Sequence, residues 1–174
     1  MERDYSGDGR IFQADLRSPE DIGREAAERA IARLNPRKPR TGTYPVLFDE
    51  RVSSTLIGHL LSAVNGAAIG RGSSWLLGAL GEKILPDALS LIEDPHRPRC
   101  AASRPFDAEG LPTTRRAIVD GGVLTGWTLD LATGRKLGMP STGNAARGTS
   151  SGPSPSIWNV ELTQGTASRD DLIR

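Results

Sequence analysis

The side chains that could bind a metal or act as nucleophiles are few in this chain. It holds two histidines and one cysteine, whereas a zinc site needs three or four ligands in convergent geometry. His96 and Cys100 are four residues apart, but Pro95 and Pro98 forbid a regular helix between them. The pattern favours a loop histidine and an ordinary cysteine over a catalytic Cys–His pair.

Two carboxylates, Asp107 and Glu109, share the short stretch RPFDAEGLP. Such a pair could orient a partner or transfer protons. Acids beside Gly110 and Pro112 more commonly cap turns. Both readings stay open, and we take the two carboxylates as candidates for a groove or an interface.

A second candidate cluster lies in a loop rich in Ser, Gly and Pro at residues 141–155. Thr142, Gly143, Asn144 and Arg147 offer hydroxyl, amide and guanidinium groups that suit binding to a peptide backbone. A plain loop of the same composition is an equal alternative.

The element that must position these groups is the run 52–70, which carries no formal charge over nineteen residues. Its apolar residues recur every fourth position, which predicts one buried helical face, and the opposite face carries a stripe of small residues.

His59 lies on this helix and is a packed residue or a groove candidate. Nine of the nineteen residues are Ser, Thr, Gly, His or Asn, so we expect a buried helix and no membrane span. The apolar stripe is Val52, Leu56, Leu60 and Val64, and the small stripe is Thr55, Gly58, Ser62 and Gly66.

Capping and turn signals predict the other elements of an α+β fold. We expect a helix over 18–35 that begins at Ser18-Pro19, a strand at 44–48 ahead of the long helix, and a second helix from 73 or 74 to Pro86. Short antiparallel strands follow, with a hairpin at Asp120-Gly121-Gly122. Their expected ranges are 88–93, 116–119, 123–129 and 157–162, with a helical turn at 133–137.

The expected domain organisation has three parts. Residues 1–14 are a disordered lead-in, residues 15–40 are a helix and a basic linker from a preceding domain, and residues 41–174 are part of a further domain. Ser168-Arg169-Asp170-Asp171 begins a capped helix that stops after a few residues. We therefore expect a fragment of a larger two-domain protein.

Charge and composition narrow the function classes. A net charge of +1 and a pI near 7.9 give no field that would collect nucleic acid. A single cysteine fits a reducing compartment, and the start MERD lacks the apolar core of a signal peptide. We expect a cytoplasmic protein that does not bind nucleic acid directly.

Several ordered blocks resemble the TldD/PmbA family, long known as modulators of DNA gyrase and microcin-processing proteins, and in particular its PmbA or TldE branch. The likeness spans about residue 15 to the end. The blocks are YPVLFDERVSSTLIGHLLSAVNGAAIGRGSSWLLGALGEKILPDALSLIEDPHRPR, SRPFDAEGLPTTRRAIVDGGVLTGWTLDLATGRKLGMPSTGNAARG, PSPSIWNVEL and GTASRDDLI.

The resemblance implies proteolysis of unfolded or leader peptides by a TldD–TldE heterodimer. Zinc would be held only by the TldD subunit, in a His-Glu-x-x-x-His helix. The corresponding positions here are Ile57, Gly58 and Ser62, which cannot replace two imidazoles and a water-activating glutamate. The resemblance thus implies a chain with no catalytic residue, metal or cofactor of its own, and a TldD-like zinc subunit as partner.

The resemblance also bears on the loop at 142–144, because the family often has Thr-Gly followed by Asn or His there. Thr142, Gly143 and Asn144 fit that pattern and become the first candidates for a peptide groove. The alternative function is a stand-alone regulatory or binding module of the gyrase-modulator type without protease activity. A third reading is a degenerate product with no function.

Overall fold

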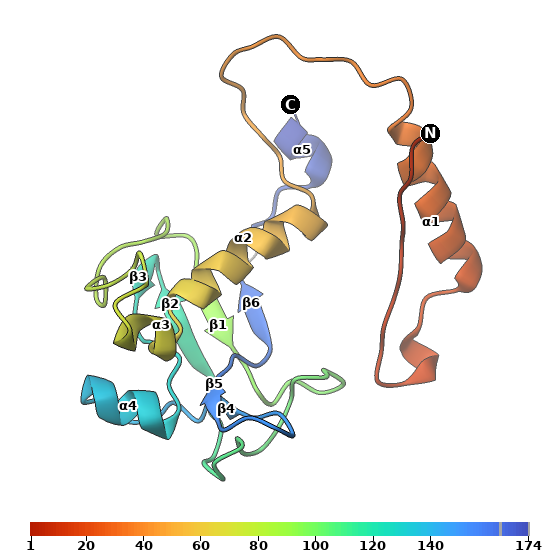
Figure 1. The fold of residues 1–174 in the computed structure, drawn as a ribbon. Coiled ribbons are helices and arrows are strands. Elements are labelled where there is room, and N and C mark those ends of the chain that lie inside the picture. Colours follow the sequence, from red (N-terminus) through yellow and green to blue (C-terminus); the bar gives the residue numbers. More distant parts are fainter. Residues whose placement is uncertain (164, 174) are drawn as a thin grey trace. The chain divides into compact units, whose positions relative to one another are not determined.

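The computed structural model describes residues 1–163 and 165–173. The chain divides into two compact units, residues 1–46 with 99–101 and residues 47–98 with 102–174. Figure 1 labels the elements of each.

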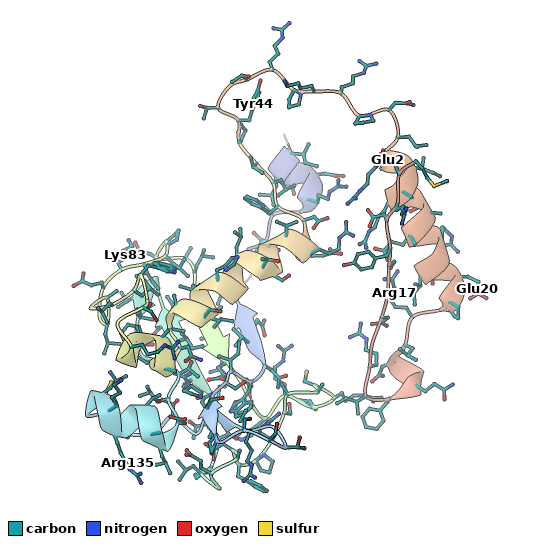
Figure 2. The ribbon with its side chains drawn as sticks, viewed as in Figure 1. Glu2, Arg17, Glu20, Tyr44, Lys83 and Arg135 are labelled. Atoms are coloured by element: carbon teal, nitrogen blue, oxygen red, sulfur yellow. The ribbon has the colours of Figure 1, made fainter. Side chains whose placement is uncertain are left out.

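The first unit is built on the helix α1, Pro19–Ala32, preceded by the 3-10 turn η1, Gln13–Asp15. The Oγ atom of Ser18 accepts a hydrogen bond from the Asp21 N–H at 3.1 Å, so the predicted N-cap is confirmed. The expected helix over 18–35 ends three residues early, at Ala32. Arg17, labelled in Figure 2, pairs with Glu25 at 2.7 Å. The Ser6 hydroxyl and Arg17 together hold the pKa of Glu25 below its ordinary value.

The second unit is built on a four-stranded antiparallel sheet. Its strands are β1 Leu91–Glu93, β2 Arg116–Asp120, β3 Val123–Leu124 and β6 Val160–Leu162, in the order β3-β2-β1-β6. Gly121 and Gly122, both with positive φ, make the turn between β2 and β3, so the predicted hairpin is confirmed.

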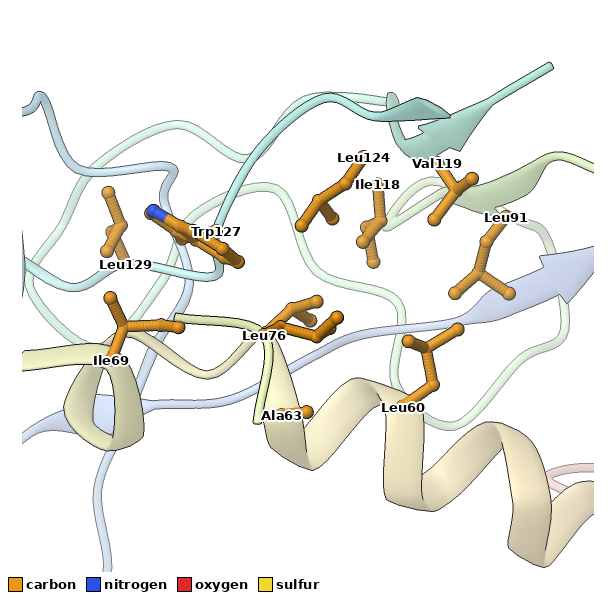
Figure 3. Packing of buried hydrophobic residues seen from close by; sticks show 11 residues of the cluster. Leu60, Ala63, Ile69, Leu76, Leu91, Ile118, Val119, Leu124, Trp127 and Leu129 are labelled. Atoms are coloured by element: carbon orange, nitrogen blue, oxygen red, sulfur yellow. The ribbon is translucent and has the colours of Figure 1, made fainter. Parts of the chain in front are cut away.

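The helix α2, Glu50–Ala63, packs its C-terminal half against this sheet. Figure 3 shows Leu60 and Ala63 pointing toward Leu91, Ile118 and the other buried side chains. The N-terminal half of the same stripe is open, since Val52 and Leu56 are each 48% exposed while Leu60 is 7% exposed. The predicted apolar stripe is therefore buried over only half its length.

The expected helix over 52–70 is two helices, because α2 ends at Ala63 and α3 spans Gly66–Gly70. Pairing with Thr128 causes the break. Its N–H donates to the Val64 carbonyl at 3.0 Å, and its carbonyl accepts from the Gly66 N–H at 2.8 Å. The Asn65 side chain then caps α3 by accepting from Ala67 N–H at 2.9 Å. A tertiary contact here overrides the local helical pattern.

The predicted strand at 44–48 is wrong. Residues 43–49 have no regular structure, and no described strand pairs with them. Alternating apolar residues favour an extended backbone, but a strand needs a neighbour for its hydrogen bonds.

The predicted helix from 73 or 74 to Pro86 is also wrong, because these residues form a series of turns. Gly78 and Gly81 adopt positive φ, which interrupts a right-handed helix. The backbone bonds to β3 instead. Gly81 N–H donates to the Leu124 carbonyl at 2.8 Å, and Leu124 N–H donates to the Glu82 carbonyl at 2.9 Å. The β3 edge of the sheet is thereby covered.

The remaining elements complete the second unit. They are α4 Leu131–Leu137, which begins with a capping box at Asp130, the paired β4 Ala145–Ala146 and β5 Ser154–Pro155, and α5 Arg169–Ile173. The helical turn expected at 133–137 is the second part of α4. The α+β class is confirmed, and among the described residues no helix is long and apolar enough to span a membrane.

The uneven burial of the α2 stripe gives a first prediction. We expect Leu60→Ala to lower the free energy of unfolding by about 2–5 kcal/mol, because it leaves a cavity in the core. Leu56→Ala, one helical turn away and half-exposed, should change the same quantity by less than about 1 kcal/mol. Urea denaturation of the two variants measures the difference, and equal losses would contradict the packing of α2.

Candidate functional site

The centre of the second unit is the carboxylate of Glu93, which is 1% exposed at the end of β1. Its Oε1 atom accepts hydrogen bonds from Asn144 Nδ2 at 2.8 Å and from the Trp158 N–H at 2.7 Å. Its Oε2 atom accepts from Arg116 Nε at 2.8 Å. A buried charge is tolerated only when it is paired and hydrogen-bonded, and these three donors meet that requirement.

Arg116 carries the network from Glu93 toward the next segment of the chain. Its Nη1 donates to the Trp127 carbonyl at 2.9 Å, and its Nη2 donates to Thr128 Oγ1 at 3.0 Å. Thr128 is the residue that breaks the long helix. The Glu93 carboxylate and the end of α2 are thus connected through one guanidinium.

The predicted peptide-binding residues 142–144 are part of this frame. The Asn144 side chain is 1% exposed and donates to Glu93 and to the Ser156 carbonyl, the latter at 2.8 Å. The Gly143 carbonyl accepts from Trp158 Nε1 at 3.0 Å. The Thr142 hydroxyl accepts from the Leu129 N–H at 2.8 Å. These bonds give the three residues a structural role, and their place in a peptide groove stays a prediction.

The carboxylates of Asp107 and Glu109 both accept hydrogen bonds from backbone N–H groups. Asp107 is 4% exposed, and its oxygens accept from the N–H groups of Glu109, Leu111 and Ala145 at 2.9–3.0 Å. Glu109 Oε2 accepts from the Leu131 N–H at 2.8 Å, at the start of α4. The two acids therefore act on this structure as turn and helix caps.

The remaining two predicted residues are exposed. His59 lies on the outer surface of α2, and Arg147 lies in the loop between β4 and β5. The structure does not bring either of them to the buried network, so their role at an interface stays a prediction.

A hollow of about 200 Å³ lies between the small stripe of α2 and the segment that follows β5. Ser62 donates its hydroxyl to the Gly58 carbonyl at 2.9 Å, and a Cβ atom on Gly58 would meet nothing within 4 Å. Asn65 Nδ2 donates to the Pro155 carbonyl at 3.0 Å and fixes one end. The lining residues are Gly58, Leu61, Ser62, Asn65, Pro155, Ser156 and Ile157.

The side chains in this hollow do not fit a zinc ion. Ile57 packs against the core, Gly58 offers no donor atom, and the Ser62 hydroxyl is bonded to its own helix. Across residues 1–163 and 165–173, no group of three His, Cys, Asp or Glu side chains is placed to hold a metal. That this chain works without zinc of its own stays a prediction.

The sheet edge near the hollow has free backbone groups. On the side that faces β1, the Asn159 carbonyl accepts a hydrogen bond from the Asp94 N–H at 2.8 Å, and the Thr163 N–H donates to the Ser90 carbonyl at 2.9 Å. Because strand residues alternate, the N–H and C=O groups of Val160 and Leu162 point away from β1. Among the described residues no strand pairs with that side. A groove of about 660 Å³ follows it, lined by Arg97, residues 160–163, Gly165 and Ala167.

Three residues that organise this region were not predicted from the sequence: Glu93, Arg116 and Trp158. Glu93 is the last residue of β1, and Arg116 is the first residue of β2. A charged residue at the end of a short strand is usually exposed, so neither residue is expected to be buried. Only the register of β1 against β2, which places Glu93 opposite Arg116, shows that the two charges meet inside the fold.

Comparisons with known proteins agree on one relationship. Residues 41–174 match the PmbA/TldA metallopeptidase C-terminal domain. The metalloprotease PmbA of Escherichia coli O157:H7 is 46% identical over 145 residues, which is 83% of this chain and 32% of that protein. A metalloprotease TldD homolog of Buchnera aphidicola is 27% identical over 156 residues, 87% of this chain and 32% of that protein.

Two solved structures are similar in fold. A candidate modulator of DNA gyrase from Bacteroides thetaiotaomicron has a TM-score of 0.82 and 32% identity, covering 94% of this chain and 35% of that one. TldE from Thermococcus kodakarensis has a TM-score of 0.59 and 30% identity, covering 66% and 26%. The chain therefore spans about a third of the length of these relatives.

The buried network gives a second prediction. Glu93→Gln leaves the largely buried Arg116 guanidinium with no carboxylate partner, so we expect a loss of about 3–5 kcal/mol in the free energy of unfolding. Thermal or urea unfolding measures it.

A matched control lies on the neighbouring strand. Glu161 is exposed and pairs with Arg97 at 3.4 Å, so Glu161→Gln should change stability by less than about 1 kcal/mol. A loss for Glu93→Gln no larger than that of the control would show that the buried pair is not the organising contact.

Proposed function

This chain belongs to the PmbA/TldD metallopeptidase family, and we propose that it is a PmbA/TldE-like subunit with no catalytic centre of its own. In this proposal it pairs with a zinc-bearing TldD-like subunit and helps to hold unfolded or leader peptides. The reaction class is inferred from the family, and the non-catalytic role is inferred from the geometry of this chain.

The observation that carries the proposal is the hollow beside Gly58 and Ser62. It lies where the resemblance places the metal motif of the family, and it is bounded by a bare glycine Cα and a hydroxyl that is already bonded. Hydrolysis of an amide by this kind of centre needs a cation and a base to activate water. The space is present here and the chemical groups are not, which supports the assignment of catalysis to the partner.

The free edge of β6 supports the peptide-holding part of the proposal. An extended chain can add to an exposed strand through main-chain hydrogen bonds, which accept many side-chain sequences. The hollow includes Ile157, three residues before Val160, so the two features follow one another along the same segment. A peptide paired with β6 would therefore run toward the position of the metal motif.

The third prediction tests catalysis. The purified full chain should contain far less than one equivalent of zinc and should not cleave a fluorogenic unfolded peptide. With the purified TldD-like subunit from the same genome, cleavage should appear or increase. Stoichiometric zinc or full cleavage by this chain alone would contradict the proposal, and a salt-dependent shift of DNA would favour the gyrase-modulator alternative.

The fourth prediction tests strand addition at β6. Leu162→Pro removes an outward N–H, and the net contribution of one such bond is about 0.5–1.5 kcal/mol, so peptide affinity should fall up to about tenfold. Leu162→Ala removes the same core contact and keeps the N–H, so it is the matched control. Fluorescence anisotropy of a labelled extended peptide measures both, and equal affinities for the two variants would exclude this edge as the peptide site.

A further inference from the structure

Asn65 lies in the break between α2 and α3, and its side chain makes two hydrogen bonds of opposite kind. The Oδ1 atom accepts from the Ala67 N–H at 2.9 Å and caps α3. The Nδ2 atom donates to the Pro155 carbonyl at 3.0 Å, in the segment that forms the other wall of the hollow. In the described part of the chain, no further hydrogen bond joins residues 57–70 to residues 154–158. This one amide therefore bridges the two walls.

The carbonyl that Asn65 binds has no alternative partner in β4. Ala145 lies opposite Pro155 in the β4–β5 pair, but the Ala145 N–H and carbonyl bond to Asp107 and Ala108. Pro155 is buried, and a proline has no N–H with which to add a second bond. A buried carbonyl without a partner destabilises a fold, so the Asn65 amide stabilises the arrangement in which the end of β5 lies beside α2.

The same wall carries a main-chain N–H that is free. Ser156 directs its N–H and carbonyl toward β4, where Asn144 bonds to them at 2.7 and 2.8 Å. Because neighbouring residues of a strand alternate, Pro155 and Ile157 direct theirs away from β4, toward Asn65 and α2. Within residues 1–163 and 165–173, no group accepts a hydrogen bond from the Ile157 N–H. A carbonyl of an extended peptide in the hollow can accept it, as in strand addition.

A ring of hydrogen bonds runs behind the hollow and returns to Asn65. It starts at Ser156 in one wall and ends at two backbone groups that flank Asn65 in the other, the Val64 carbonyl and the Gly66 N–H. Each step is 2.7–3.0 Å long. The side chains between the two walls are, in order, Asn144, Glu93, Arg116 and Thr128.

We propose that Asn65 is a positioning residue for peptide binding, because its amide holds the Ile157 N–H at the distance from α2 at which an extended peptide can enter and bond. This inference rests on the proposed function. The buried ring restrains both walls from behind, and the Asn65–Pro155 bond restrains the opening between them. A primary amide suits this task because it carries an acceptor and a donor on one rigid group.

Without this bond, residues 155–157 are divided between a conformation beside α2 and a displaced one. A ligand that binds only the first conformation is bound more weakly in proportion to the fraction that remains competent. The loss of one neutral hydrogen bond corresponds to about a 2- to 10-fold change in such an equilibrium. The catalytic groups of the partner are not altered, so KM should rise while kcat stays the same.

A structural test uses Asn65→Asp, which changes a single atom of the bridge. The substitution keeps the size of the side chain and the oxygen that caps α3, but an ionised carboxylate has no donor for the Pro155 carbonyl. In the labelled full chain without a partner, an HNCO spectrum detects the Pro155 carbonyl through the Ser156 amide. We expect the carbonyl resonance to move upfield and the Ile157 amide resonance to shift. An unmoved Pro155 resonance would overturn the inference and leave the proposed function standing.

A kinetic test measures cleavage of a fluorogenic unfolded peptide by the full chain together with the purified TldD-like subunit. Asn65→Ser, which keeps a capping oxygen, should raise KM about 2- to 10-fold at unchanged kcat, and Asn65→Asp should raise it further because two oxygens then face each other. Thr125→Val is the matched control. It removes a hydroxyl that bonds to the Ala117 carbonyl at 2.9 Å, beside β3, so both constants should equal those of the unaltered chain.

The outcomes distinguish this inference from the proposed function. A raised KM at constant kcat, together with a moved Pro155 resonance, supports the positioning role. An unchanged KM despite a moved resonance, or a fall in kcat alone, overturns that role while cleavage by the unaltered pair keeps the proposed function. If the unaltered chain gives no partner-dependent cleavage, the proposed function fails and the positioning role fails with it.

Discussion

A single buried carboxylate determines where the parts of the second unit lie. Glu93 accepts hydrogen bonds from β2, from the loop after α4 and from the segment that leads to β6. A charge in a dry interior destabilises any arrangement that leaves it unpaired, so three segments far apart in sequence must meet at one strand end. The apolar core packs beside this set of hydrogen bonds, which fixes the positions of the three segments.

The shape of the candidate site follows from that frame more than from the residues lining it. Asn144 donates to the Ser156 carbonyl and the Trp158 N–H donates to Glu93, while Asn65, the N-cap of α3, donates to the Pro155 carbonyl. The wall opposite α2 is therefore fixed by hydrogen bonds from Asn144, Trp158 and Asn65, and of these three residues only Asn65 lines the hollow. Gly58 has no side chain, and no other atom lies within 4 Å of the place where its Cβ would be, so the space beside it stays open.

Local signals in the sequence predicted those elements whose ends are set by local chemistry. The Ser18 cap and the glycines after β2 act within a few residues, so the start of α1 and the hairpin were predicted, whereas only the second part of α4 was expected, as a helical turn at 133–137. The errors arose where distant contacts decide. Thr128 divides the long helix, β3 draws residues 81–84 out of a helical pattern, and residues 44–48 have no described strand to pair with. Sequence periodicity contains no information about such partners.

In the candidate site, too, the sequence indicates which side chains form hydrogen bonds but does not identify their partners. An amide or hydroxyl suited to a peptide backbone is equally suited to the protein's own backbone, so Asn144 and Thr142 could be recognised as hydrogen-bonding residues but not assigned to a groove. No buried side-chain nitrogen or oxygen in the described residues lacks a partner, which leaves little polar capacity in the interior for a ligand. The apolar and backbone groups that stay open at the surface of the described residues include the outward backbone groups of β6 and the exposed N-terminal half of the α2 stripe.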